Sequence, residues 1–207
     1  MIETSAKSVC NLNLEGLLSS PQSRWCMWTN NGSVPTKTNG VRIKAYEIWR
    51  HMIARCGYLD GVSEPNYEDV TVNDDWLEYS NFYHDITTLK GYDTKRFVLD
   101  KDLLVKGNTE YRKDVVCFLP YEINNFLTDS RKTRGVYLIG VDFHKKTGKF
   151  RARCRKHLGL FDTEVEAFNV YKVAKEALAK ELALKYKDEI DIRAYQALLN
   201  YEVNTED

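Results

Sequence analysis

The sequence predicts an α+β fold, in which a helical N-terminal region and a ββα unit precede a three-stranded antiparallel sheet packed on a long helix. Two observations support this prediction. Apolar residues recur at helical spacing in residues 44–55, 73–86 and 163–189, and runs rich in β-forming residues lie between the second and third of these segments. A chain of 207 residues with 43% hydrophobic content has room for two small domains.

The N-terminal part combines an arm with two expected helices. Residues 1–36 show weak patterning and end in a segment rich in turn formers, which predicts an arm and a loop. The first helix is expected from Lys44 to Arg55, because aromatic and aliphatic residues share one of its faces. The second is expected within residues 73–86, where acidic side chains in the first turn suit the helix dipole. Its apolar face comprises Trp76, Tyr79 and Tyr83.

The middle of the chain has the order strand, loop, strand, helix. Two β-rich runs, Arg96 to Val105 and Asp114 to Leu119, flank a Gly-Asn turn signal. Pro120 then stands near the first turn of a short helix, where the missing N–H of proline is tolerated. A polar and basic stretch follows, so the sequence places a domain boundary at about residues 128–136.

The next segment predicts the antiparallel sheet. Two alternating runs surround the turn KKTGK, and a short LGLF strand completes a meander. Because side chains alternate along a strand, the second strand has a basic face and an apolar face. A helix with Asp162 or Thr163 as its N-cap is expected to cover the apolar face. The basic face comprises Arg151, Arg153 and Arg155, the apolar face Phe150, Ala152 and Cys154, and the helical stripe Ala167, Val170, Tyr171, Ala174, Leu178 and Leu182.

Charge is segregated along the chain, although 30 basic and 30 acidic residues cancel in the sum. Cys56 to Leu89 contains eight acids and no lysine or arginine, which helix starts and a solvated loop explain in good part. Arg131 to Leu160 contains ten bases and the single acid Asp142. Such an excess is typical of a surface that contacts a phosphate backbone, with a solvated loop as the alternative.

The cysteines and the hydropathy exclude other classes. The five cysteines are widely spaced and form no CxxC pair, which argues against a disulfide framework and against a zinc site. We find no run of 18 apolar residues and no signal-peptide pattern, so a cytoplasmic protein without a membrane partner is expected.

The segment GVDFHKKTGKFRARCRKHLGLFDTEVEAFNVYKVAKEA resembles the Apetala-type (ethylene-response-factor-like) DNA-binding domain. The likeness lies in its GV opening, its GKFRA strand, its LGLF strand and the helix that follows. It implies that the sheet docks in the major groove of double-stranded DNA. The implied DNA-binding residues are Lys145, Lys146, Lys149, Arg151, Arg153, Arg155 and Lys156.

The upstream motifs YEIWRHMIARC, LDKDLLVKGN and CFLPYEINNFL are similar to the N-terminal half of the HNH homing-endonuclease-like proteins of bacteriophages. The likeness covers about residues 37–207. It implies an arm at 1–36, an HNH-like domain with a degenerate His-Me finger-like ββα unit at 37–130, and an Apetala-type domain with C-terminal helices at 131–207. It also implies a viral nuclease, a hydrolase acting in the cytoplasm of an infected bacterial host cell.

The resemblance also implies an active site. In that family a histidine acts as general base, and an acid beside it with a helical His or Asn holds one divalent metal. By position, Asp100 is the acid, Lys101 stands in place of the base, and Asn108 lies in the connecting loop. Asn124 falls at the helical ligand, and with Asp100 and Asp102 it would hold Mg²⁺ or Mn²⁺. The general-base histidine is thus replaced by Lys101.

Three functions remain open from the sequence. The first is a sequence-specific DNA-binding nuclease that cleaves or nicks duplex DNA with a divalent metal. The second is a catalytically inactive HNH-derived binder without a cofactor, acting as a repressor, a site-occluding protein or an interference protein. The third is a protein–protein adaptor, which leaves the basic strand unexplained. Monomer and homodimer are both compatible with the sequence.

Overall fold

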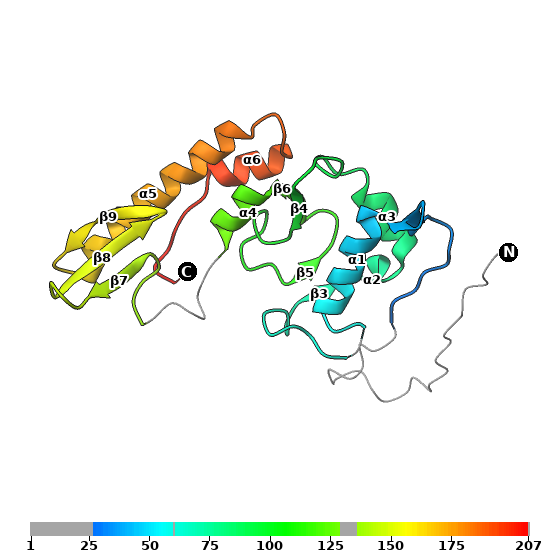
Figure 1. Ribbon diagram of the computed structural model, residues 1–207, viewed down its shortest axis with the longest axis horizontal. Helices are drawn as coiled ribbons and strands as arrows, with labels where there is room; N and C mark the ends of the chain where they lie inside the picture. Colours follow the sequence, from blue (N-terminus) through cyan, green and yellow to red (C-terminus); the bar gives the residue numbers. More distant parts are fainter. Residues whose placement is uncertain (1–26, 60, 129–135, 207) are drawn as a thin grey trace. The chain divides into compact units, whose positions relative to one another are not determined.

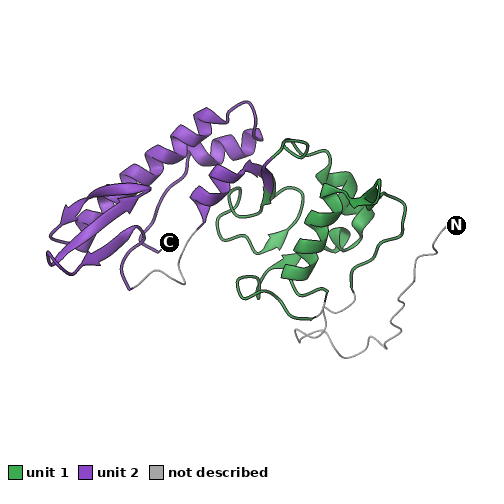
Figure 2. Cartoon of the chain, in the orientation of Figure 1, with its two compact units in different colours: residues 1–95, 99–117 green, residues 96–98, 118–207 purple. Residues whose placement is uncertain are grey.

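The computed structural model describes residues 27–59, 61–128 and 136–206, which divide into two compact units (Figure 2). Unit 1 is formed by Met1–Lys95 with Leu99–Cys117, and unit 2 by Arg96–Val98 with Phe118–Asp207. Most of the expected N-terminal arm and most of the expected domain boundary lie outside the described residues.

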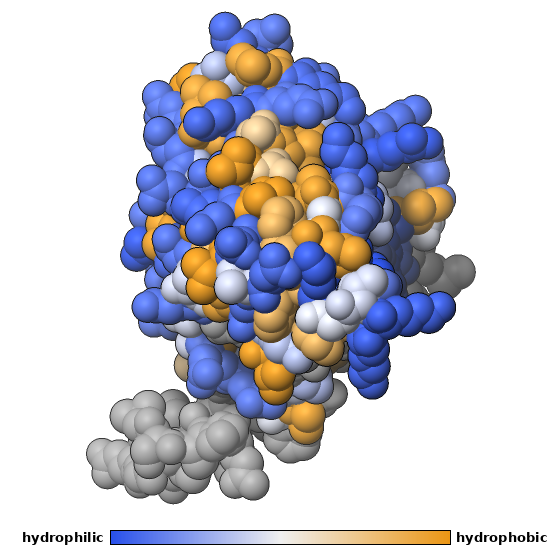
Figure 3. Space-filling view, turned by 90° about the vertical axis from the view of Figure 1, so that its left-hand side faces the viewer, coloured by the Kyte–Doolittle hydropathy of each residue, from blue (hydrophilic) through white to orange (hydrophobic). Residues whose placement is uncertain are grey.

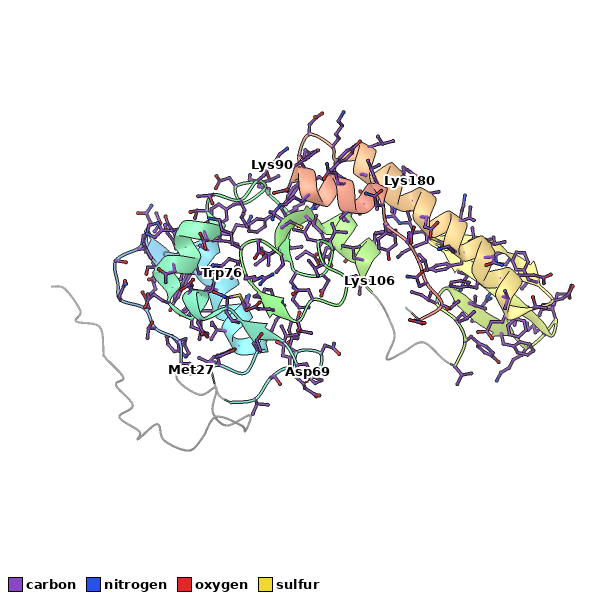
Figure 4. All side chains as sticks on the ribbon, turned by 180° about the vertical axis from the view of Figure 1, so that it is seen from behind. Met27, Asp69, Trp76, Lys90, Lys106 and Lys180 are labelled. Atoms are coloured by element: carbon purple, nitrogen blue, oxygen red, sulfur yellow. The ribbon has the colours of Figure 1, made fainter. Side chains whose placement is uncertain are left out.

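Unit 1 is built on helices. α1 spans Lys44–Arg55, as the sequence predicts, and contacts α3. Its buried face includes Trp49, whose indole Nε1 donates to the backbone oxygen of Trp76 at 2.8 Å. Figure 4 labels Trp76 among these helices. The two helices that follow α1 are α2 (Asp74–Leu77) and α3 (Tyr79–Ile86).

The prediction of one continuous helix over residues 73–86 is wrong, because the helix is interrupted at Glu78. The backbone of Glu78 is extended (φ −89°, ψ 121°), and its carboxylate accepts from Ser80 N at the start of α3. Thr29 donates its N–H to Leu77 O and accepts from Tyr79 N, both at 2.9 Å. A tertiary contact from 49 residues away therefore overrides the helical periodicity.

The strands of residues 37–120 are short. Asp100 ends the first strand of the expected ββα unit, because its Oδ1 accepts from the backbone N–H of Asp102 and Leu103 and turns the chain. The predicted strand to Val105 is therefore too long. The two-stranded pairs are β1 (Lys37–Thr38) with β2 (Val41–Arg42), β3 (Thr71–Val72) with β5 (Glu110–Tyr111), and β4 (Phe97–Asp100) with β6 (Cys117–Pro120), and β6 leads into α4 (Tyr121–Leu127).

Unit 2 contains the expected three-stranded antiparallel sheet and the long helix (Figure 1). The strands are in the order β7, β8, β9, and α5 contacts all three of them. Thr163 caps α5 through a capping box with Glu166, which confirms one of the two expected N-caps. The elements are β7 (Val141–His144), β8 (Lys149–Cys154), β9 (Lys156–Phe161), α5 (Glu164–Lys185) and α6 (Ile192–Leu199).

The core of unit 2 lies between the sheet and α5. Ala152 is fully buried, and Phe150 and Cys154 pack against the same cluster, so the predicted apolar face of the strand is confirmed. The predicted helical stripe is only partly right, because Val170 is 36% exposed. The buried cluster comprises Val141, Ala152, Ala167, Phe168, Tyr171 and Val203.

The C-terminal segment closes this core. Val203 is 1% exposed. Its backbone oxygen accepts from Lys172 Nζ at 2.6 Å, and its N–H donates to Glu176 Oε1 at 3.0 Å. Two side chains of α5 thereby hold the segment beyond α6 against the core. In the part of the chain that the structure describes, no helix is long and apolar enough to cross a membrane.

Candidate nucleic-acid interface

The sheet of unit 2 has one covered face and one outer face. α5 and the buried cluster occupy the covered face, to which Val141, Phe150 and Ala152 contribute. Because side chains alternate, the intervening residues of the strands lie on the other side. The cross-strand pairs Asp142 with Arg151, His144 with Lys149, and Arg153 with His157 set their positions. The outer face comprises Asp142, His144, Lys149, Arg151, Arg153, His157 and Leu160.

Two arginines of the outer face share one carboxylate. Arg151 Nη2 lies 2.7 Å from Asp142 Oδ1, and Arg151 Nε donates to the same oxygen at 3.0 Å. Arg153 Nη2 lies 3.0 Å from Asp142 Oδ2. The side chains are partly solvated, with exposures of 31% for Arg151 and 58% for Arg153. The pair of guanidinium groups thus keeps a net positive charge after one carboxylate is subtracted.

Arg155 does not continue the alternation, so the prediction that it shares a strand face with Arg151 and Arg153 is wrong. β8 ends at Cys154, and Arg155 has a left-handed backbone (φ 54°) between β8 and β9. A register shift between Ala152 and Arg153 precedes it. Its Nη1 lies 3.4 Å from Glu122 Oε1, on α4 of the same unit.

Three lysines are exposed at the ends of the strands, and a fourth, Lys149, lies on the outer face. Lys145 and Lys146 lie in the turn between β7 and β8, and Lys156 begins β9; all three are exposed. Within the described part of the chain, none of these three forms an ion pair within 4 Å. Lys149 lies 2.9 Å from Asp162 Oδ1, an exposed pair. The expected bases at positions 131, 132 and 134 lie outside the described residues.

Glu122 joins α4 to the end of α5. Its Oε2 lies 2.5 Å from Lys185 Nζ and accepts from Tyr186 Oη at 2.8 Å. The hydrogen bond from Lys185, followed by that from Tyr186, lowers the pKa of Glu122 below its ordinary value. Lys175 adds a second link, because its ammonium donates to Phe126 O and lies 4.0 Å from the centroid of the Phe126 ring. Unit 2 thus holds α4 firmly, although the sequence assigned this helix to the preceding domain.

The expected catalytic residues of unit 1 lie at the end of β4 and in the loop that follows it. Asp100 is 8% exposed, and its Oδ1 accepts from Asp102 N at 3.1 Å and from Leu103 N at 2.9 Å. Burial raises the pKa of the Asp100 carboxyl above its ordinary value. Asn124 lies on α4 in unit 2, so it belongs to the other compact unit.

Lys101 and Asn108 hold this loop closed. Lys101 Nζ donates to Asp102 Oδ1 at 2.5 Å and to Asn108 O at 3.2 Å. Asn108 Nδ2 donates to Lys101 O at 2.8 Å and to Glu110 O at 2.7 Å, while its Oδ1 accepts from Glu110 N at 3.1 Å. The polar atoms of the Asn108 side chain are all engaged within the loop. Lys106, labelled in Figure 4, lies in the same loop.

The polar groups of this loop bond to one another and to the backbone. The ammonium of Lys101 already occupies the position next to the Asp102 carboxylate, where a divalent cation would compete with it. Asp100 Oδ1 is engaged by two backbone donors. Across the residues that the structure describes, no group of three or more His, Cys, Asp or Glu side chains could hold a metal ion.

The surface of unit 2 is mixed rather than uniformly basic. Figure 3 views the side on which unit 2 lies in Figure 1, and hydrophilic residues there surround a band of apolar ones. Leu160 is 36% exposed on the outer face, opposite Arg151. His144, His157 and Leu160 were not predicted from the sequence to be interface residues. The alternation of side chains in β7 and the register of β9 would have identified them, once the register shift between Ala152 and Arg153 was known.

Comparisons with models of protein families, with curated proteins and with solved structures found no match.

Proposed function

We propose that unit 2 binds double-stranded DNA through the outer face of its sheet. The observation that carries this proposal is the row of basic side chains on β8, Lys149, Arg151 and Arg153, on the face opposite the core. β-Strands are among the elements that DNA-binding proteins place in the major groove, where side chains reach base edges.

The charge around the sheet suits a phosphate backbone. Lys145, Lys146 and Lys156 are exposed at the ends of the strands, where they would meet the phosphates that flank a groove. Arg151 and Arg153 lie between them and offer planar forks of donors. The division into peripheral lysines and central arginines resembles the division between contacts that position a protein and contacts that read a sequence.

Salt dependence of binding tests the proposal. The affinity of the full-length protein for a duplex is measured by fluorescence anisotropy over a series of salt concentrations. Arg151→Ala and Arg153→Ala are compared with Lys180→Ala, which removes an equal charge from the exposed side of α5 (Figure 4). Loss of a residue that neutralises a phosphate reduces the steepness of log affinity against log salt by about one, whereas loss of a base contact lowers affinity with little change in that slope.

The outcomes of this experiment differ clearly. We expect the outer-face variants to lose affinity, whereas Lys180→Ala binds nearly as the wild type does. Equal behaviour of all three variants would exclude the outer face as the DNA surface. Preference for duplex RNA over DNA would also contradict the proposal, because the deep major groove of A-form RNA is too narrow for the sheet.

The second candidate function is metal-dependent cleavage by the loop of Asp100, Lys101 and Asn108. The engaged polar atoms of this loop favour the alternative, a DNA binder without cleavage that acts as a repressor, a site-occluding protein or an interference protein. Incubation with supercoiled plasmid plus Mg²⁺ or Mn²⁺ distinguishes the two. Nicking that Asp100→Ala or Asn124→Ala abolishes would support the nuclease, and binding without nicking would support the alternative.

A further inference from the structure

Asp142 is the one acidic residue on the outer face as defined above, and it lies beside the basic side chains of β8. Its carboxylate is 33% exposed and contacts both arginines of that face. The three side chains are 31–58% exposed and form a network in which one carboxylate contacts two guanidinium groups. Besides any contribution to stability, such a network fixes both arginines in one arrangement.

The geometry of the contact leaves one donor edge of Arg151 available. A guanidinium has two edges that can donate in parallel, Nε with Nη2 and Nη1 with Nη2. Asp142 occupies the first edge, since Nε and Nη2 of Arg151 lie 3.0 Å and 2.7 Å from its Oδ1. The Nη1 edge is the type of fork that donates to O6 and N7 of guanine. A guanidinium fixed in this way loses less conformational freedom on binding.

The charge of Asp142 also favours contacts of the two arginines with bases over contacts with phosphates. A phosphate is an anion and would be repelled by the carboxylate, besides having to compete with it for the arginines. Guanine presents acceptors without a net charge, so the same carboxylate opposes a base contact much less. The arrangement therefore penalises contacts that every DNA sequence offers and preserves contacts that depend on the base.

We propose that Asp142 is a positioning residue for sequence discrimination, which holds Arg151 and Arg153 for base contacts and suppresses their use on phosphates. This inference rests on the proposed binding of DNA by unit 2. It assigns to an acid a role in DNA recognition that charge complementarity alone would not predict.

The test compares Asp142→Asn with Asp188→Asn, which removes an equal charge from an exposed position after α5. Each full-length protein is titrated with a duplex of arbitrary sequence, and is also incubated with a pool of duplexes that have a randomised centre. Sequencing of the bound fraction gives the base preference. Asp142→Ser provides a second neutral side chain, and Asp142→Glu keeps the charge on a longer stem.

We expect Asp142→Asn to bind the arbitrary duplex about tenfold more tightly than Asp188→Asn and to lose base preference in the selected pool. Asp142→Glu should keep the weak binding of arbitrary sequence with a partly reduced preference. A purely structural role would lower the melting temperature of the Asp142 variants without changing the selected sequences.

Two failures are distinguishable. If the wild type binds no duplex in the pool, the proposed function itself is wrong. If the wild type binds with a clear preference, and Asp142→Asn and Asp142→Ser match Asp188→Asn in both measurements, only the inference about Asp142 is wrong.

Discussion

Gly140 precedes β7 at a position where unit 2 has no room for a side chain. Its φ is +76°, a left-handed conformation, and a Cβ built there would meet atoms of the Tyr171 ring at 2.1 to 2.4 Å. Tyr171 itself belongs to the buried cluster, so the ring has little freedom to move away. We therefore predict that Gly140→Ala strongly destabilises unit 2.

The expected magnitude has two parts. A left-handed conformation costs an alanine about 1–2 kcal/mol. Overpacking of a well-packed core costs typically ~1–3 kcal/mol more. Gly140→Ala should therefore lower the free energy of unfolding by about 2–5 kcal/mol. Gly148→Ala is the matched control, because Gly148 has φ +67° and a Cβ added to it would meet nothing within 4 Å. It should cost only about 1–2 kcal/mol.

Two spectroscopic probes separate the units in a denaturant titration. All four tryptophans precede residue 96, so tryptophan fluorescence reports on the N-terminal part of the chain. Far-ultraviolet circular dichroism also detects the long helix α5. We expect Gly140→Ala to lower the midpoint of the dichroism transition and to leave the fluorescence transition nearly unchanged. A cost no greater than that of Gly148→Ala would refute the steric argument.

Three further predictions concern polar groups. Glu122→Gln should destabilise unit 2 near neutral pH, as measured by denaturation at several pH values. Because the folded-state pKa of Glu122 is lowered, the difference in stability from the wild type should be present above about pH 4.5 and should disappear as the pH falls through the lowered pKa. Asp100→Asn should be at least as stable as the wild type near neutral pH, because burial raises the pKa of Asp100 and the cost of its charged form grows as the pH rises through that pKa. Asp100→Ala instead leaves two backbone donors unsatisfied and should cost about 1–3 kcal/mol in thermal or chemical unfolding. Asn108→Ala should cost ~2 kcal/mol by the same measurement, with the exposed Asn125→Ala near zero, and equal effects would show that the loop bonds contribute little.

The sequence predicts best those elements whose signals are local. α1 has the expected bounds, and the capping box of α5 could be located from the spacing of Thr163 and Glu166. The two faces of β8 follow from alternation as far as Cys154. Each of these features depends on residues within one or two turns of the chain, which is the range over which periodicity and capping are informative.

The errors arise where contacts with distant segments, or the backbone conformation, determine where a helix or strand ends and which way a side chain points. The break at Glu78 depends on Thr29, which periodicity within residues 73–86 does not reveal. The left-handed backbone at Arg155 follows a register shift between β8 and β9, and alternation is blind to such shifts. The early end of β4 could have been anticipated, because an aspartate readily bonds the N–H groups that follow it. The predicted outer face wrongly includes Arg155 for the same reason, since the face on which a strand residue lies can be predicted only if the register is known.

The helix α4 changes how the basic sheet should be understood. By position in the sequence, α4 completes the ββα unit, and the resemblance gives it a metal ligand at Asn124. Its contacts within unit 2 give it a different role, because Phe126 packs against Tyr201 with ring centroids 5.2 Å apart and Glu122 binds Lys185 and Arg155. The side chain of Arg155 therefore contacts α4, through an ion pair of 3.4 Å with Glu122. A fragment that begins at residue 131 would lack this helix and its contacts with Arg155, Lys185 and Tyr201, so the proposed DNA binding by unit 2 should be tested with α4 included.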